Sequence, residues 1–326
     1  MRATLGFFKL FPPPIFMLMP HAGLDVSDDA IRCVAYSGVG DNRKLASYAS
    51  ADLPVGLVDG GDVKDEKEFV ARLADFGREH GLSYVKISVP EEKAYLFQTE
   101  VPATDQRDVE RNIEFKLEEN VPLSAQDAVF YFDLLPPATN GATLRASVSV
   151  IPGTYVEHYM ALLGKAGLTT VAFEVVPKAI ARVVVSPNTM DAKLVVHIMN
   201  QKTGIYIISG GTVNFASTST WGGAEKGSSQ SEIIAALSKE VTRVHSYWLS
   251  HGNGRPLDEL ILVGRNAAAF ESACRNIDVG SPLAVRVADV WTNAFDINRH
   301  LPPITNAESL EYAVAAGLAL DTTYDD

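Results

Sequence analysis

Two polar turns, far apart in the sequence, carry residue types that hold phosphate groups. In the first, Asp25 and Ser27 end a short apolar run, and Arg32 lies a few residues further on. In the second, Lys202 and Thr203 follow a longer apolar run. Backbone amides of tight turns bind phosphate oxygens, and a nearby carboxylate can hold magnesium through water. These five residues are therefore candidate phosphate ligands, and Asp25 is also the candidate metal ligand.

Each turn belongs to a pattern that occurs twice in the chain. Both copies indicate a strand, a polar turn, a second strand, a glycine-containing turn and a third strand. The three runs of the first copy are 23–27, 31–36 and 44–53, and those of the second are 194–198, 203–209 and 212–218. A duplicated three-stranded meander predicts two related lobes with a cleft between them, where ligands usually bind. The two candidate turns then face each other across that cleft.

The length and the spacing of the remaining elements predict how the chain is divided. At 326 residues the chain exceeds one typical domain. We expect an N-terminal arm at 1–20, a first lobe at 21–190 and a second lobe at 191–326. Over residues 90–167 the sequence pattern changes, and segments typical of strands alternate with segments typical of helices. This predicts an α+β subdomain inserted in the first lobe. A closing helix is expected over 308–320 and a last strand over 285–290.

Composition excludes several classes of partner. The net charge is −12. A protein that binds nucleic acid needs a positive surface, so nucleic acid is not expected as a partner. Broad binding to anionic lipid is disfavoured for the same reason. Cys33 and Cys274 fall in a predicted strand and a predicted helix, which indicates reduced packing residues in a cytoplasmic protein.

The N-terminal run 7–19 is apolar but is interrupted by three consecutive prolines. It is too short and too proline-rich to span a bilayer as a helix. We interpret it as an extended arm on the first lobe, with a membrane-surface or partner-docking arm as the alternative. No later segment reaches transmembrane length, so no direct transmembrane segment is expected.

Four stretches, in the expected order, together carry a family resemblance. The run 23–32 resembles the first phosphate loop of actin-like proteins, most closely that of the type IV pilus assembly protein PilM family, which is related to the division protein FtsA. The run 113–123 leading into 129–135 resembles that family's inserted subdomain. The run 260–264 resembles its adenosine-side strand and turn, and 308–320 resembles its C-terminal helix. The similarity covers the chain from about residue 21 to its end.

The resemblance implies an α/β, actin-like (ribonuclease H-like) duplicated two-lobe fold with an inserted α+β subdomain. It implies ATP with magnesium between the lobes and a scaffold of a pilus or secretion platform rather than a metabolic enzyme. It also implies docking of the cytoplasmic tail of an inner-membrane PilN-type protein between the inserted subdomain and the first lobe. Contact with other platform proteins and a cytoplasmic place, peripheral to the inner membrane through partners, follow from the same resemblance.

The resemblance adds candidate ligands on the adenosine side. Lys239, Glu240 and Arg243 share one face of a predicted helix and match the family's ribose and adenine contacts. A solvated charged face is the alternative interpretation of the same spacing. Gly264 would let the adenine lie against the backbone.

Both candidate turns depart from the family pattern. Asp28 and Asp29 stand where small residues are usual, and their charge opposes a triphosphate. His197 and Met199 stand where the family has aspartate and glycine, which removes a magnesium anchor. The sequence therefore predicts a degenerate nucleotide cleft.

Two other functions remain open at this stage. An active ATPase or phosphotransferase could use the same fold, since the fold alone does not fix the activity. It needs a general base, and the adjacent Glu91 and Glu92 are interpreted as solvated surface residues. A membrane-tethered filament protein is the third hypothesis, and the acidic run 321–326 is unsuited to a lipid anchor.

Overall fold

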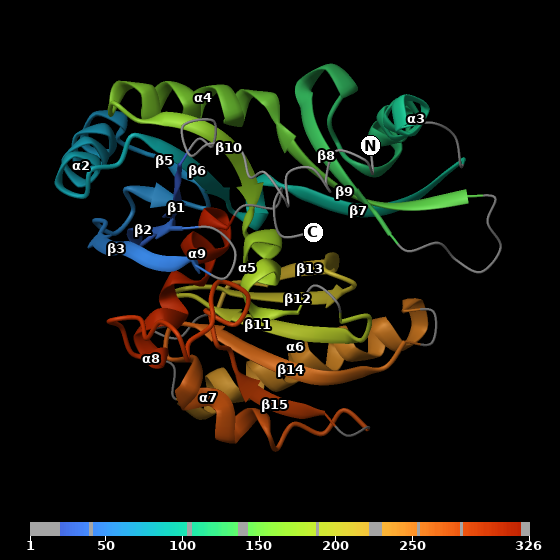
Figure 1. Cartoon of the computed structure of the whole chain (residues 1–326). Coiled ribbons are helices and arrows are strands. Elements are labelled where there is room, and N and C mark those ends of the chain that lie inside the picture. Colours follow the sequence, from blue (N-terminus) through green and yellow to red (C-terminus); the bar gives the residue numbers. More distant parts are fainter. Residues whose placement is uncertain are drawn as a thin grey trace.

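The computed structural model describes residues 20–38, 42–102, 106–135, 143–186, 189–221, 230–252, 255–280 and 283–320. The N-terminal arm predicted over 1–20 lies outside this part of the chain except for its last residue. The structure has two five-stranded sheets, and in Figure 1 the sheet that contains β1 lies above the sheet that contains β11.

The sheet of the first lobe has the strand order β10-β6-β1-β2-β3. Strands β1 (Ala22–Val26), β2 (Ala30–Ser37) and β3 (Lys44–Asp52) form an antiparallel meander. Strands β6 (Tyr84–Val89) and β10 (Thr169–Val175) then add in parallel beside β1. Every residue of β1 is buried, and β6 is buried over its last three residues.

The second lobe repeats this topology, with the strand order β13-β12-β11-β14-β15. Strands β11 (Ala192–Ile198), β12 (Thr203–Ser209) and β13 (Thr212–Ser219) form its meander. Strands β14 (Leu257–Gly264) and β15 (Ala284–Val287) add in parallel. The duplicated meander expected from the sequence is confirmed, strand for strand.

A separate three-stranded antiparallel sheet lies between β6 and α4 in the sequence, and we call its residues 95–152 the insert. Its order is β7-β9-β8, from β7 (Tyr95–Pro102), β8 (Ala128–Leu134) and β9 (Thr143–Pro152). Helix α3 (Gln106–Asn120) covers one face through Val109, Ile113 and Leu117, and the short turn η4 (Ala125–Asp127) leads into β8. The expected α+β subdomain is present, and its exact boundaries stay a prediction.

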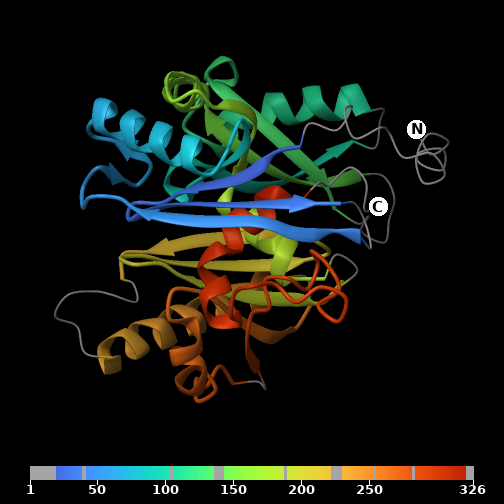
Figure 2. The same cartoon turned by 60° about the vertical axis from the view of Figure 1, so that its left-hand side comes forward.

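Helices cover the outer faces of both sheets (Figure 2). Helices α2 (Glu66–Glu79) and α4 (Gly153–Lys165) lie on the first lobe, and α6 (Gln230–His251) and α7 (Ala267–Cys274) lie on the second. Helix α2 begins where the Asp65 carboxylate accepts a hydrogen bond from the Glu68 amide at 3.0 Å, an N-cap that satisfies an otherwise unpaired donor.

Two helices fill the space between the sheets. Helix α5 (Val176–Val184) follows the first lobe, and α9 (Ala313–Ala319) closes the chain. They approach so closely that a Cβ atom on Gly317 would lie 1.9 Å from the Ala179 carbonyl oxygen. Gly23 of β1 lies equally close to α9, with 2.0 Å to the Ala315 carbonyl oxygen. Glycine at these points is a packing requirement.

Two local expectations are corrected, and one short hairpin was not expected. The expected helix over 308–320 is instead α8 (Asn306–Ser309), a 3-10 turn η5 (Leu310–Tyr312) and then α9. The last strand ends at Val287 because the chain turns at Asp289, whose carboxylate accepts from the Trp291 amide at 3.0 Å. A small hairpin of β4 (Val58–Asp59) and β5 (Asp62–Val63) was not expected, although Gly60 and Gly61 between them both have positive φ, as such a turn requires.

Candidate functional site

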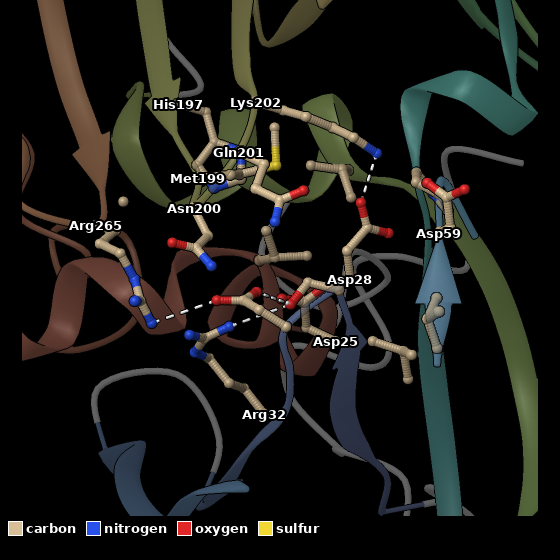
Figure 3. A pocket seen from close by; sticks show the side chains of 18 of the residues that line it. Asp25, Asp28, Arg32, Asp59, His197, Met199, Asn200, Gln201, Lys202 and Arg265 are labelled. Atoms are coloured by element: carbon tan, nitrogen blue, oxygen red, sulfur yellow. Dashed lines mark hydrogen bonds and ion pairs between the residues drawn. The ribbon is translucent and has the colours of Figure 1, made fainter. Parts of the chain in front are cut away.

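A cleft between the two sheets forms a cavity of about 310 Å³. The β1–β2 turn and the residues after β6 line it from the first lobe, and the β11–β12 turn and the end of β14 line it from the second (Figure 3). The two candidate turns therefore meet across one cavity, as the duplicated meander predicts.

The first turn is closed by its own side chains. Ser27 Oγ donates to Asp29 Oδ1 at 2.8 Å and accepts from the Ala30 amide at 3.2 Å. Arg32 Nη1 reaches the same hydroxyl at 3.4 Å. The Ser27 hydroxyl is therefore already bonded within its own turn.

Asp25, near the end of β1, is tied to the neighbouring strand. Ser88 Oγ of β6 donates to Asp25 Oδ1 at 2.8 Å and accepts from the Val26 amide at 3.2 Å. Burial raises the pKa of the Asp25 carboxyl group, while Arg32 and the Ser88 hydrogen bond act in the opposite direction.

Lys202 of the second turn binds two carboxylates of the other lobe. Its Nζ lies 2.6 Å from Asp28 Oδ2 and 2.7 Å from Glu92 Oε1. Figure 3 shows the Lys202 side chain extending across the cavity to Asp28. Burial acts to lower the pKa of Lys202, but the hydrogen bonds to Asp28 and Glu92 outweigh it, so the pKa is raised. The β4–β5 hairpin adds the Gly60 amide, which donates to Asp28 Oδ1 at 2.8 Å.

Arg265, directly after β14, makes the second set of contacts between the lobes. Its Nη2 lies 3.3 Å from Asp29 Oδ2 and 3.5 Å from Glu311 Oε2. Arg32 Nη2 donates to the same Glu311 oxygen at 2.7 Å. Glu311 lies in η5, between the sheets, so one carboxylate holds an arginine from each lobe.

A third contact joins the lobes deeper in the cleft. The Tyr206 hydroxyl of β12 donates to Glu91 Oε1 in η3 (Glu91–Lys93) and lies 3.4 Å from His197 Nδ1. Withdrawal from water raises the pKa of Glu91 to about 7, whereas burial lowers the pKa of His197 to about 3 and keeps its ring neutral. The expectation that Glu91 is a solvated surface carboxylate is wrong. Sequence reasoning missed it because only the fold brings Tyr206 beside it.

The cleft does not fit a triphosphate with magnesium in this arrangement. Seven carboxyl side chains line it, against four lysine or arginine side chains. Each of those four cations already has a carboxylate partner: Arg32 with Glu311, Lys64 with Asp59, Lys202 with Asp28, and Arg265 with Asp29. A polyanion would have to break these pairs and then meet the released carboxylates. Within the described ranges, no group of three or more His, Cys, Asp or Glu side chains is suited to a metal ion.

The structure brings some of the predicted ligands together and separates others. Asp25, Ser27, Arg32, Lys202 and Gly264 line the cavity. Thr203 is fully buried beside it, and its hydroxyl has no hydrogen-bond partner. Lys239, Glu240 and Arg243 lie on α6 and do not line the cavity; Arg243 Nη2 instead lies 2.8 Å from Glu240 Oε2. The roles of all these residues as nucleotide ligands stay predictions.

Gly264 has a reason for being glycine that involves no ligand. Its φ is 95°, and a Cβ atom there would lie 2.2 Å from the Ile198 carbonyl oxygen. The glycine lets the end of β14 approach the end of β11, which brings Arg265 into the cleft.

A second, larger hollow of about 850 Å³ lies between the insert and the first lobe. We call it the groove. Its walls are β8 of the insert, β10 of the first lobe, α5 and the β12–β13 turn of the second lobe. Val129, Tyr131 and Leu134 of β8 line it with 49%, 59% and 49% of their surface exposed, so an apolar strip is open to a ligand.

Charged groups at the floor and rim of the groove are paired. Glu174 of β10 is buried between Arg182 Nη1 and Lys86 Nζ, each at 2.8 Å from Oε2. Lys178 Nζ lies 2.9 Å from Asp133 Oδ2 and 3.8 Å from the centre of the Tyr131 ring. The groove therefore offers an apolar strip, and the charged side chains at its floor and rim are held and neutralised by ion pairs.

No helix in the described part of the chain is long and apolar enough to cross a membrane.

Comparison with known proteins places the chain in a family. Residues 23–234, about two thirds of the chain, match the family model of the type IV pilus assembly protein PilM. None of the curated proteins compared with the chain matches it in sequence.

Solved structures resemble this chain to different degrees. A PilM-PilN type IV pilus biogenesis complex matches with a TM-score of 0.77 at 20% identity, covering 94% of this chain and 99% of that one. The cytoplasmic domain of EpsL, from the type II secretion system of Vibrio cholerae, matches with a TM-score of 0.48 at 13% identity, covering 90% and 93%. A Bacteroides thetaiotaomicron protein with an actin-like ATPase fold and unknown function matches with 0.44 at 11%, covering 86% and 93%. The match to the PilM-PilN complex and the strand order together confirm the expected two-lobe fold with an inserted subdomain.

Proposed function

Because the chain belongs to the family of type IV pilus assembly proteins PilM, we propose that it is a cytoplasmic scaffold of a type IV pilus or type II secretion-like platform. In this proposal it docks the cytoplasmic tail of an inner-membrane PilN-type protein in the groove and is peripheral to the membrane through that partner. The similarity to a solved PilM-PilN complex supports the choice of partner.

The observation that carries the proposal is that two sheet edges border one apolar hollow. Strand β8 is the edge of the insert sheet, and β10 is the edge of the first-lobe sheet. An edge strand presents backbone N–H and C=O groups that an extended peptide can pair with, while side-chain pockets give specificity. The groove combines both features.

The dimensions and charges of the groove favour an extended, apolar peptide. Strand β8 has seven residues, which at about 3.3 Å per residue gives an edge of roughly 23 Å. Lys178 and Asp133 neutralise each other at the rim, so a charged peptide would gain little there. Apolar side chains that cover Val129, Tyr131 and Leu134 would bury area worth about 25 cal/mol per Å².

The test is a titration of the purified chain into a fluorescently labelled synthetic tail peptide of the PilN-type protein from the same organism, read by anisotropy. Tyr131→Ala removes the largest exposed side chain of the strip and should weaken binding about tenfold or more, because aromatic anchors dominate such contacts. Phe115→Ala is the matched control, since Phe115 is 74% exposed on α3 but does not line the groove. Equal effects of the two substitutions would contradict the proposal.

The alternative, an active ATPase or phosphotransferase, draws on one observation. Glu91 has a pKa near neutrality in the cleft, which suits a general base. Its carboxyl group, however, accepts a hydrogen bond from Tyr206, and the cations beside it are paired with carboxylates. We therefore propose that the cleft has a structural role and that its site for ATP with magnesium is degenerate. Release of phosphate from ATP that is abolished by Asp25→Ala would favour the enzyme instead.

A further inference from the structure

We propose that the cleft is a latch: carboxylates of the first lobe hold the cations of the second lobe, fix the angle between the lobes without nucleotide, and so set the width of the groove. The part that concerns the groove rests on the proposed docking function, and the part that concerns the lobes does not.

Ion pairs join the two lobes across the cleft. Lys202 joins the β11–β12 turn to Asp28 and Glu92 at 2.6 and 2.7 Å, and Arg265 joins the end of β14 to Asp29 at 3.3 Å. All three carboxylates belong to the first lobe, and both cations belong to the second. The pairs therefore span the cleft, and separating the lobes breaks every one of them.

The side chains that form these pairs are partly buried. The Lys202 side chain is 20% exposed, and those of Asp28 and Glu92 are 27% and 32% exposed. Ion pairs at this depth are screened less by salt than pairs on an open surface. The Tyr206–Glu91 hydrogen bond adds a further contact between the same two lobes.

The insert is hydrogen-bonded to the second lobe, although its residues lie within the first lobe in the sequence. Ser147 Oγ of β9 donates to the Val213 carbonyl oxygen of β13 at 2.9 Å, and both residues are buried. Gln98 Nε2 of β7 donates to Asn214 Oδ1 at 2.8 Å, and Arg145 Nη2 holds the other end of the Gln98 amide at 2.6 Å. These hydrogen bonds hold β7 and β9 of the insert against β13 of the second lobe.

Both lobes contribute walls to the groove. Strand β10 gives the groove one wall from the first lobe, whereas Gly210, Gly211 and Thr212 give it another from the β12–β13 turn of the second. Strand β8 lies in the same sheet as the fastened strands β7 and β9. A rotation between the lobes must therefore change the distance from β8 and the β12–β13 turn to β10.

The test measures the angle between the lobes and the peptide affinity in the same variants. Spin labels on Lys67→Cys in α2 and Ala268→Cys in α7, both at exposed positions, report the distance between the lobes by pulsed electron resonance. The native cysteines are buried, and burial raises the pKa of Cys33 to about 11 and that of Cys274 to about 12, so neither thiol competes for the label.

Lys202→Met combined with Arg265→Met removes the latch and nearly keeps side-chain length. We expect a broader, longer distance distribution and about a tenfold loss of tail-peptide affinity, which is about 1.4 kcal/mol. Lys202→Arg keeps the charge and should behave like the wild type. Lys193→Met is the matched control, because Lys193 pairs with Asp258 at 3.0 Å within the second lobe alone.

An unchanged distance distribution in the double variant would overturn the latch. A changed distribution with unchanged peptide affinity would overturn its link to the groove. If the wild-type chain fails to bind the tail peptide at all, the docking function and the link to the groove fail with it, and the distance measurement still decides whether the latch exists.

Discussion

Replacing Glu174 by glutamine should destabilise the chain strongly at neutral pH. Glu174 lies at the floor of the groove with 8% of its surface exposed, between the guanidinium of Arg182 and the ammonium of Lys86. Arg182 also donates to the Gly317 carbonyl oxygen of α9 at 2.6 Å. The carboxylate thus neutralises a cation that joins β10 and α5 to the closing helix.

The pKa of Glu174 gives the size of the effect. Burial alone would raise it, but Arg182 and Lys86 outweigh burial and lower it from 4.5 to about 2. At 1.36 kcal/mol per pKa unit, this corresponds to about 3 kcal/mol of stability at pH 7. Because the folded-state pKa is the lower one, this stability is present above pH 4.5 and is lost as the pH falls towards 2. Burial lowers the pKa of Lys86, and the charge of Glu174 acts in the opposite direction.

Urea unfolding of the wild type and Glu174→Gln at several pH values between 7 and 3 is the assay. We expect a difference in unfolding free energy of about 3 kcal/mol at pH 7 that narrows below pH 4.5. Glu66→Gln is the control, because Glu66 is half exposed and its pair with Lys165 should contribute little. A Glu174→Gln variant as stable as the wild type at pH 7 would refute the reasoning.

Three further predictions follow from the cleft and the packing of α9. Glu91 has a raised pKa of about 7, so the folded chain binds more protons than the unfolded chain between pH 4.5 and 7, and stability falls as the pH rises through that window. Glu91→Gln should therefore raise the melting temperature at pH 8 and change it little at pH 4.5. The reverse pattern in calorimetry would contradict this prediction. Asp28→Asn with Asp29→Asn removes carboxylates that hold Lys202 and Arg265, so titration calorimetry should detect tighter binding of ATP with magnesium than in the wild type. Equal heats would argue against competition between these carboxylates and the phosphate groups of ATP. Gly317→Ala should cost about 1–3 kcal/mol or more in urea unfolding because its Cβ meets backbone at 1.9 Å, whereas Gly164→Ala in α4 meets nothing within 4 Å and should be neutral or gain up to about 1 kcal/mol.

The fold was predictable because its signals are local. The alternation of apolar residues and the polar turns of each meander recur within about thirty residues of one another, and such patterns specify strands directly. The insert was visible for the same reason, as a helix pattern around Ile113 and strand patterns on either side. The short hairpin at Gly60 and Gly61 was missed because its strands have two residues each, too few for any period to show.

The pairing inside the cleft was not predictable, because it depends on residues far apart in the sequence. Glu91 and Glu92 are neighbours in the chain, yet one meets Tyr206 and the other meets Lys202. Glu311, more than two hundred residues later, meets Arg32. Adjacent acidic residues on a surface give the same sequence pattern as adjacent acidic residues in a cleft, so only the fold distinguishes them.

The same residues explain both the resemblance to nucleotide-binding proteins and the poor fit to nucleotide. Arg32, Lys202 and Arg265 line the cavity, so it contains cations of the kind that bind phosphate. Asp28, Asp29 and Glu311 supply negative charge from within the chain. In a protein whose lobes open and close with a nucleotide, the phosphate groups of the nucleotide bring this negative charge when it binds and remove it when it leaves. In a protein whose groove must keep one width, carboxylates of the chain itself can supply this negative charge. The lobes are then held at a fixed angle at every nucleotide concentration.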